Sequence, residues 1–184
     1  MGSIDELAGF SRDMVSIICK PTNLRPFVCE GSPFECEAFI VGFNPASEMS
    51  VDFWNFWSDS HGFDKCSWFE AYKAERRNRP LKPGKTRRNE ISNTRRVIQW
   101  VIDEANPTKC LETNIYAKPS ESKPDLKRLL KTMSLEERNR ITAPFDYLLH
   151  QITPKLVVAH DEDAAKYLQA QKLKCDLVCV SHFS

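Results

Sequence analysis

Two asparagines and two histidines attract attention in this 184-residue sequence, because each follows a short apolar run. They are Asn44, Asn114, His160 and His182. A neutral amide is no strong base, but it can orient a water molecule or pair with the edge of a planar ligand. An imidazole can donate a hydrogen bond to an oxygen atom that gains negative charge. These side chains suit hydrogen-bonded recognition and the positioning of water.

The apolar segments that hold these residues in place read as strands. Residues 38–43, 110–116, 155–159 and 176–180 are short and apolar, which predicts buried strands. They alternate with helical patterns, as in a parallel sheet covered on both faces. We therefore predict an α/β fold, a three-layer α/β/α sandwich around a mainly parallel four-stranded sheet, in a single domain over residues 1–184. Because the carboxyl ends of parallel strands share one edge, the four polar side chains should converge there.

The rest of the chain supplies helices and loops. Residues 21–36 hold three prolines and read as a loop. Residues 52–72 hold eight aromatic side chains and predict two short helices split near His61 and Gly62, with some rings free to stack on a planar ligand. Helices are predicted for residues 4–19, for about 93–105 after an N-cap at Ser92, from the Ser134–Glu137 capping box onward, after Pro144, and for 161–171.

The net charge of +1 conceals a strong asymmetry. Residues 73–96 hold ten Lys or Arg against two Glu, whereas residues 1–72 hold eleven Asp or Glu against four Lys or Arg. A local excess of this kind favours a polyanionic partner, although a solvated basic loop is the alternative.

Several classes of protein are disfavoured by composition. No apolar run approaches the roughly 18 residues of a membrane span, and the first residues do not resemble a secretory signal, so we expect a cytoplasmic protein. The seven cysteines include no Cys-x-x-Cys pair, which argues against a zinc ribbon or a disulfide framework. Most should be buried thiols, and an iron–sulfur cluster has no support in their spacing. We expect no metal and no cofactor.

Four short motifs, in this order, resemble those of the uracil-DNA glycosylase superfamily over roughly residues 37–184. They are similar to its water-activating motif, base-reading strand end, third strand and His-x-Ser motif. Asn in the first motif, where the most active uracil-specific branch has Asp, is similar to the mismatch-directed and single-strand-selective branches. The motifs are Gly42-Phe43-Asn44-Pro45, Thr113-Asn114, Val157-Val158-Ala159-His160 and Ser181-His182-Phe183-Ser184.

The resemblance implies a monofunctional DNA glycosylase that flips uracil or another deaminated base into a pocket and hydrolyses its N-glycosidic bond. Asn44 would position the water, and His182 would donate to a carbonyl oxygen of the leaving base. Base binding would fall to Phe43, to the Asn114 amide that reads the base edge, and to Phe56 or, as second choice, Trp57 as the stacking ring.

The same resemblance implies DNA as the partner and a monomer as the working form. Hydroxyls and an arginine would contact the backbone, and Phe183 would lie near the duplex. The backbone contacts are expected from Ser47, Ser92, Arg95 and Ser184. Four of these residues also have a simpler structural interpretation. Asn44 could belong to an ordinary turn, and Asn114 could cap a strand. His182 could be an incidental terminal residue, and Arg95 could pair with an acid on a helix face.

Two departures from the family keep a second function open. Asp161 follows His160 where the family often has Gly, so it should cap a helix and repel a phosphate. The chain also stops at Ser184, directly after the His motif, as a short member or a truncated one would. The alternative is a weak or inactive nucleic-acid or nucleotide-binding member of the same fold. A different α/β hydrolase or nucleotide-handling protein, in which Asn44 and His182 never meet, is a third possibility.

Overall fold

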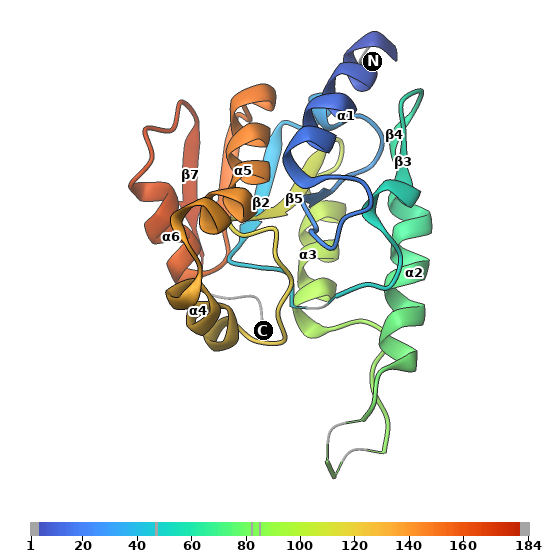
Figure 1. The fold of residues 1–184 in the computed structure, drawn as a ribbon. Helices are drawn as coiled ribbons and strands as arrows, with labels where there is room; N and C mark the ends of the chain where they lie inside the picture. The colour runs from blue at the N-terminus through green and yellow to red at the C-terminus, as the bar shows by residue number, and fades with distance from the viewer. Residues whose placement is uncertain (1–3, 47, 82, 85, 181–184) are drawn as a thin grey trace.

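The computed structural model describes residues 4–46, 48–81, 83–84 and 86–180, and its centre is one mixed sheet of five strands (Figure 1). The strand order is β1-β5-β2-β6-β7. A two-stranded hairpin lies apart from this sheet. The five strands are β1 (Phe27–Val28), β2 (Ala38–Gly42), β5 (Cys110–Asn114), β6 (Leu156–Ala159) and β7 (Asp176–Cys179).

Four of the five strands run parallel, as predicted. In the register of the sheet, Gly42 at the end of β2 lies beside Asn114 at the end of β5, and Val41 lies beside Ala159 at the end of β6. The fifth strand, β1, corrects the prediction: it pairs antiparallel with β5 inside the segment that the sequence predicted as a loop. Two residues are too few for a hydrophobic pattern to reveal a strand.

Both faces of β2 are buried, and different helices cover them. All five β2 residues are buried. On one face, Ala38 and Ile40 pack with Ile98 of helix α3 (Asn93–Glu104). On the other face, Phe39 and Val41 belong to the large core that also includes helices α1 (Ile4–Ile18), α5 (Leu135–Ile152) and α6 (Glu162–Gln169). The alternation of two residues along a strand explains this division.

The predicted helix caps are present, but one helix boundary differs from prediction and one helix was not predicted. The Ser92 hydroxyl accepts from the Arg95 amide, and Ser134 and Glu137 form the reciprocal capping box of α5. Pro144 lies inside α5 rather than before a separate helix. The structure also contains a helix that the sequence did not reveal, α4 (Lys123–Thr132), which begins at an N-cap on Ser122.

The aromatic segment forms a short 3-10 helix, a hairpin and a long helix, which corrects the prediction of two short helices. These elements are η2 (Phe53–Phe56), β3 (Trp57–Ser58), β4 (Gly62–Phe63) and α2 (Lys65–Asn78); a further 3-10 helix, η1, spans Pro33–Glu35. Gly62 has φ of +83°, and a Cβ there would lie 2.2 Å from the carbonyl oxygen of Gly31. Only glycine suits that position, and the hairpin turn explains the predicted break.

The connection between α2 and α3 extends away from the body of the molecule (Figure 1). It begins at Arg79, which ends α2, and it returns at Ser92, the cap of α3. Among the described residues, no helix is both long enough and apolar enough to span a membrane.

Candidate functional site

A pocket of about 270 Å³ opens at the carboxyl ends of β2, β5 and β6. Its volume lies just below the range of about 300–1,000 Å³ that is usual for small-molecule sites. The chain passes from β2 to β5 on one side and later returns to β6 on the other, so the pocket lies where the strand order reverses, the usual ligand position in such sheets. Its lining includes Arg25, Phe43, Asn44, Tyr72, Arg76, Ser92, Arg95, Glu112, Asn114, Ser120, Lys123, His160 and Asp161.

Asn44 and Phe43 reach the pocket from the turn after β2, as predicted. The Asn44 Nδ2 donates to the carbonyl oxygen of Pro45 at 3.0 Å and to the hydroxyl of Ser120 at 2.9 Å. These bonds fix the amide and direct its donor side into the protein, so Oδ1 can accept from a water molecule. The ring of Phe43 packs edge-on against Tyr116 with centroids 5.1 Å apart.

The ends of β2, β5 and β6 bring Asn114 and His160 to the same small space beside Gly42. A Cβ on Gly42 would lie 2.6 Å from Asn114 Oδ1 and 2.9 Å from His160 Nε2. Any larger residue would displace both polar groups. The missing side chain therefore lets two polar side chains approach the end of β2 closely.

Beneath these groups lies a charged floor formed by Arg25, Glu112 and Arg95. Glu112 lies in β5 beside Ile40, and both of its oxygens accept from Arg95. Both partners are buried. Burial alone would raise the pKa of Glu112, but the charge and hydrogen bonds of Arg95, with the charges of Arg25 and His160, hold that pKa below its ordinary value.

Arg25 comes from the loop before β1 and completes the floor. Its guanidinium lies over the ring of Trp68, as does that of Arg95, with distances of 5.5 Å and 4.8 Å to the ring centroid. Its pKa is lowered to about 10, mainly because burial removes water from the cation and next because Arg95 repels it.

This arrangement corrects the expectation that Arg95 binds a DNA phosphate. Its guanidinium is held by Glu112 inside the protein and is not presented to a backbone on the surface. The simpler reading, an ion pair with an acid, is the one that the structure shows. Ser92 does line the pocket, but its hydroxyl caps α3 and accepts from the Tyr72 hydroxyl at 3.1 Å.

Phe56 and Trp57 are not in the pocket, contrary to the expectation that one of them stacks on a ligand. Phe56 is buried in the aromatic core, 6.1 Å from the Phe63 ring. Trp57 stacks on Phe10 at 5.3 Å, and its indole donates to Asp59. Trp57 thus packs on α1 and Phe56 on the β4 ring of Phe63, and Phe43 is the predicted aromatic residue that lines the pocket.

Four predicted site residues fall on positions outside the described part of the chain: Ser47, His182, Phe183 and Ser184. Their roles remain predictions. Of the remaining predicted residues, the structure brings Phe43, Asn44, Ser92, Arg95 and Asn114 together.

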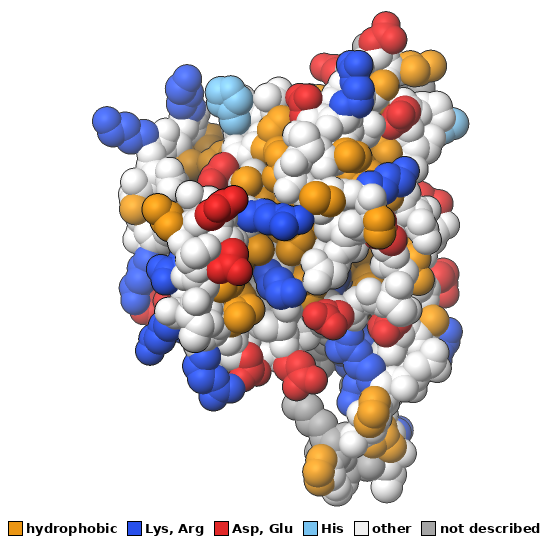
Figure 2. Space-filling model, in the orientation of Figure 1, with side chains coloured by type: hydrophobic (Ala, Val, Ile, Leu, Met, Phe, Trp, Pro, Cys, Tyr) orange, Lys and Arg blue, Asp and Glu red, His pale blue; other side chains and the backbone are white. Residues whose placement is uncertain are grey.

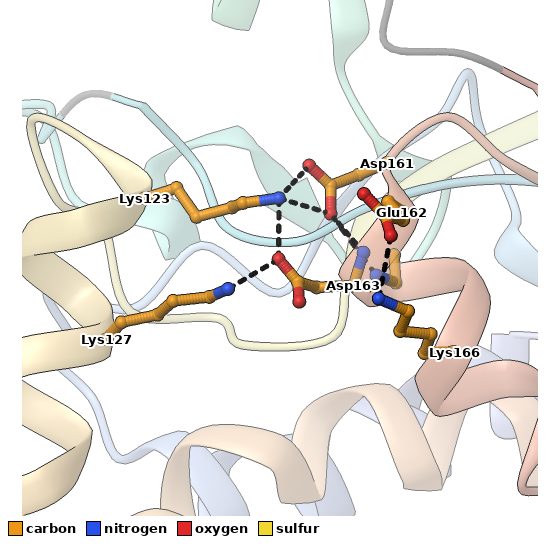
Figure 3. Close-up of polar contacts among 7 residues, drawn as sticks. Lys123, Lys127, Asp161, Glu162, Asp163 and Lys166 are labelled. Carbon is orange, nitrogen blue, oxygen red and sulfur yellow. Dashed lines mark hydrogen bonds and ion pairs between the residues drawn. The ribbon is translucent and has the colours of Figure 1, made fainter.

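One wall of the pocket is held by ion pairs between α4 and the start of α6 (Figure 3). Lys123 Nζ lies 2.8 Å from Asp161 and 2.6 Å from Asp163, and Lys127 lies 2.8 Å from the same Asp163 oxygen. Asp161 also accepts from the amides of Asp163 and Ala164, so it caps α6 as predicted. Burial would raise the pKa of Asp161, but Lys123 and these amides lower it.

A wider groove of about 980 Å³ continues from the pocket toward the α2–α3 connection and shares Ala46, Arg76 and Ser120 with it. Its lining holds four arginines and three glutamates. Figure 2 shows Lys and Arg side chains near the base of this connection, with acidic side chains among them. Three of its arginines donate to backbone carbonyls, which carry no net charge: Arg76 to Asn89, Arg79 to Glu48 and Arg88 to Pro80.

A second hollow, of about 660 Å³, lies between the end of α1 and α5. Its lining includes Ile18, Met133 and Ile141, and it contains none of the polar residues at the strand ends. We assign the candidate site to the smaller pocket, because polar groups from separate strands converge there. Within the described residues, no group of three or more His, Cys, Asp or Glu is placed to hold a metal ion.

Sequence reasoning missed Arg25, Glu112, Tyr72 and Lys123 as pocket residues, and it did not assign a role to His160. One feature of the sequence could have identified Glu112 as a site residue. Glu112 is the charged residue of the predicted strand, and a carboxylate inside a buried strand needs a partner. Nothing local marks Arg25, because it approaches the pocket from a distant loop.

Comparisons with known proteins add no family assignment: no protein-family model matches the sequence, and no curated protein matches it.

Proposed function

We propose that this chain is a monofunctional DNA glycosylase that hydrolyses the N-glycosidic bond of uracil or another deaminated base, built on a three-layer α/β/α fold of the uracil-DNA glycosylase type. The observation that carries the proposal is the convergence of Phe43, Asn44 and Asn114 on one pocket beyond the strand ends. Each was singled out from its motif, and each comes from the end of a strand.

In the proposed reaction, a flipped base enters the pocket with its edge toward Asn114. The amide has one donor and one acceptor, which match the carbonyl and N–H groups of an imide. Phe43 is the proposed stacking ring, in place of Phe56 and Trp57, because it lines the pocket.

Asn44 is the proposed water-positioning residue. The two hydrogen bonds to its Nδ2 fix the amide so that Oδ1 can hold a water molecule against the sugar. When the C1′–N bond breaks, both of its electrons leave with the base. The water oxygen bonds to C1′, and the proton that it loses ends on the released base or in solvent. This route calls for no metal, cofactor or Schiff-base lysine, because hydrogen bonds stabilise the leaving group.

DNA is the proposed partner, bound by the chain as a monomer. The groove that leads from the pocket supports this part of the proposal, since its four arginines outnumber its three glutamates and can contact a phosphate backbone. The half-buried rim residue Arg76, rather than Arg95, is the proposed backbone contact beside the pocket.

The test is base release from labelled oligonucleotides that carry uracil, hypoxanthine, xanthine or mismatched thymine, in single and double strands. We expect Asn44→Ala and His182→Ala to lower the release rate at least about a hundredfold, as removal of a group that acts in the transition state does. Gly42→Ala should abolish release by closing the space beside Asn114 and His160. A matched change at the opposite sheet edge, Lys155→Ala, should leave the rate unaltered.

A binding protein of the same fold is the second candidate, and Asp161 is the observation that favours it. Its carboxylate already occupies the first amides of α6, where a phosphate could otherwise bind. Salt-sensitive DNA binding without release of any base from the panel would support this alternative and reject the glycosylase.

A further inference from the structure

The loop that follows β5 holds the turn that follows β2. Ser120 lies in this loop and contacts the turn at two points. Its backbone N–H donates to the Pro45 carbonyl oxygen at 3.0 Å, and its hydroxyl oxygen accepts from Asn44 Nδ2 at 2.9 Å. Asn44 and Ser120 are 76 positions apart in the sequence, so no local pattern links them. The orientation of the Asn44 side chain therefore depends on a segment that follows a different strand.

The direction of the hydrogen bonds at Ser120 is set by its neighbours. The Ser120 hydroxyl lies 2.8 Å from the carbonyl oxygen of Ser122, which can only accept a hydrogen bond. A serine hydroxyl has one proton, and the bond to Ser122 uses it. Toward Asn44, the Ser120 oxygen can therefore act only as an acceptor.

Asn44 consequently has one favourable amide orientation. Its Nδ2 lies beside two acceptors, the Pro45 carbonyl oxygen at 3.0 Å and the Ser120 hydroxyl oxygen at 2.9 Å. If the amide were turned over, Oδ1 would face both oxygens and both hydrogen bonds would be lost. The surrounding oxygens thus leave Oδ1 as the atom of the amide that can meet a water molecule or a ligand in the pocket.

We propose that Ser120 is a positioning residue that makes Asn44 a fixed hydrogen-bond acceptor, able to hold a donor such as a water O–H. This inference rests on the proposed glycosylase, in which Asn44 holds the attacking water. It adds that a loop from another strand sets the polarity of that contact. It also adds that a carboxylate cannot replace the amide, because a carboxylate has no N–H to donate to Pro45 and Ser120.

The substitution Asn44→Asp separates positioning from basicity. A carboxylate is a stronger base than an amide, so a site that needed only a base at this point would gain from the change. In this structure, an ionised carboxylate would place an oxygen against the Pro45 carbonyl oxygen, and two acceptors repel each other. We expect Asn44→Asp to lower the rate of base release at least about tenfold, because the side chain loses its fixed position.

The first measurement requires no base release. The side-chain amide protons of Asn44 are identified in a proton–nitrogen NMR spectrum by their absence in Asn44→Ala. They should exchange slowly with solvent, because Nδ2 donates two hydrogen bonds. Ser120→Ala removes one acceptor and should increase the exchange rate about fivefold. Ser120→Thr retains the hydroxyl and should keep exchange slow, as should Ser16→Ala, a matched loss of a hydroxyl on α1.

The second measurement is the kinetics of base release from the oligonucleotide panel. The proton of the Ser120 hydroxyl is bonded inside the protein, so it is not available to a DNA phosphate. Ser120→Ala should therefore lower kcat about tenfold and leave KM within about twofold. Ser120→Thr should restore kcat. Circular dichroism identifies any variant that does not fold.

Fast exchange of the Asn44 amide protons in the unaltered protein would overturn the proposal, as would slow exchange that survives Ser120→Ala in a folded protein. Faster base release in Asn44→Asp would also overturn it. Protected amide protons without release of any base would reject the glycosylase and retain Ser120 as the residue that orients Asn44. Base release that Ser120→Ala leaves unaltered would do the reverse.

Discussion

Two sets of arginines in this molecule carry the same charge in opposite surroundings. Arg25 and Arg95 form the floor of the pocket, fixed over Trp68 and beside Glu112. Arg76, Arg79 and Arg88 lie along the exposed groove that leads to the α2–α3 connection, where they bond to backbone carbonyls. The first set is desolvated and held in one geometry, whereas the second is half-buried and makes hydrogen bonds that are exposed to solvent.

The difference shows why a basic stretch in a sequence does not define one function. A buried charge acts on a ligand at close range through weak screening, whereas exposed charges act together and lose their effect in salt. Arg95 belongs to the basic stretch by sequence and to the floor by structure, so position alone separates the two roles.

The largest effect on stability is expected at Glu112, the carboxylate of the buried floor. Glu112→Ala leaves two guanidiniums in a buried floor with no carboxylate between them. We expect a loss of about 3–5 kcal/mol in the free energy of unfolding, the usual effect of removing one partner of a buried pair. Denaturation in urea measures it. A loss below about 1 kcal/mol would mean that the floor is solvated like the groove.

Removing charge from the groove should weaken DNA binding rather than destabilise the fold. Arg76→Gln, Arg79→Gln and Arg88→Gln together should leave folding intact and reduce the slope of log affinity against log salt for DNA by about 0.7–0.9 per arginine. At low salt, the loss of the three arginines should weaken DNA binding about a hundredfold. Fluorescence anisotropy across a salt series measures the slope. An unchanged slope would exclude the groove from DNA binding.

The Asp161–Lys123 ion pair should have an effect between that of the buried floor and that of the exposed groove. The pH dependence of stability tests its contribution. Asp161→Asn keeps a side chain that can cap α6 but removes the charge that pairs with Lys123. Because the folded-state pKa of Asp161 is lowered, its charge stabilises the fold above its ordinary pKa. The variant should cost about 1 kcal/mol at pH 7.

That cost should decline as the pH falls below about 4 and through the lower folded-state pKa, where the wild-type carboxylate becomes protonated. Urea denaturation of both proteins from pH 7 to pH 3 follows it. A difference that stays constant over this range would indicate that the charge of Asp161 is not the cause.

The smallest effect is expected at an exposed ion pair beside the groove. Arg77 and Glu90 approach to 2.9 Å with both side chains about half exposed. Glu90→Gln should change the free energy of unfolding by less than about 0.5 kcal/mol, because solvent screens such pairs. The urea midpoint, measured beside that of Glu112→Ala, gives the contrast directly; a loss as large as that of Glu112→Ala would contradict it.

Sequence reasoning succeeded where local pattern determines structure. The apolar runs predicted the four parallel strands, and the strand ends therefore predicted that Asn44 and Asn114 would meet. The caps at Ser92 and Ser134 followed from side chains that bond within three residues. In each case the interaction that decides the structure lies within a few residues of the pattern.

Sequence reasoning failed where a contact with a distant segment of the chain determines the position of a residue. Phe56 and Trp57 were assigned as stacking rings from the family resemblance, but the close approach of Gly62 to Gly31 directs that segment into the aromatic core. Arg95 was assigned to DNA, and a carboxylate on β5 holds it instead. Such pairings depend on the three-dimensional arrangement of separate segments, which periodicity does not encode.

The position of Trp68 gives the pocket a built-in optical reporter. Two guanidiniums lie over its buried indole, whereas Trp100 on α3 is 61% exposed to solvent. Indole emission responds to the local electric field, so a ligand that shifts Arg25 or Arg95 in the pocket floor should change the spectrum of Trp68. Occupancy can therefore be followed by intrinsic fluorescence without a label, and Trp68→Phe provides the blank.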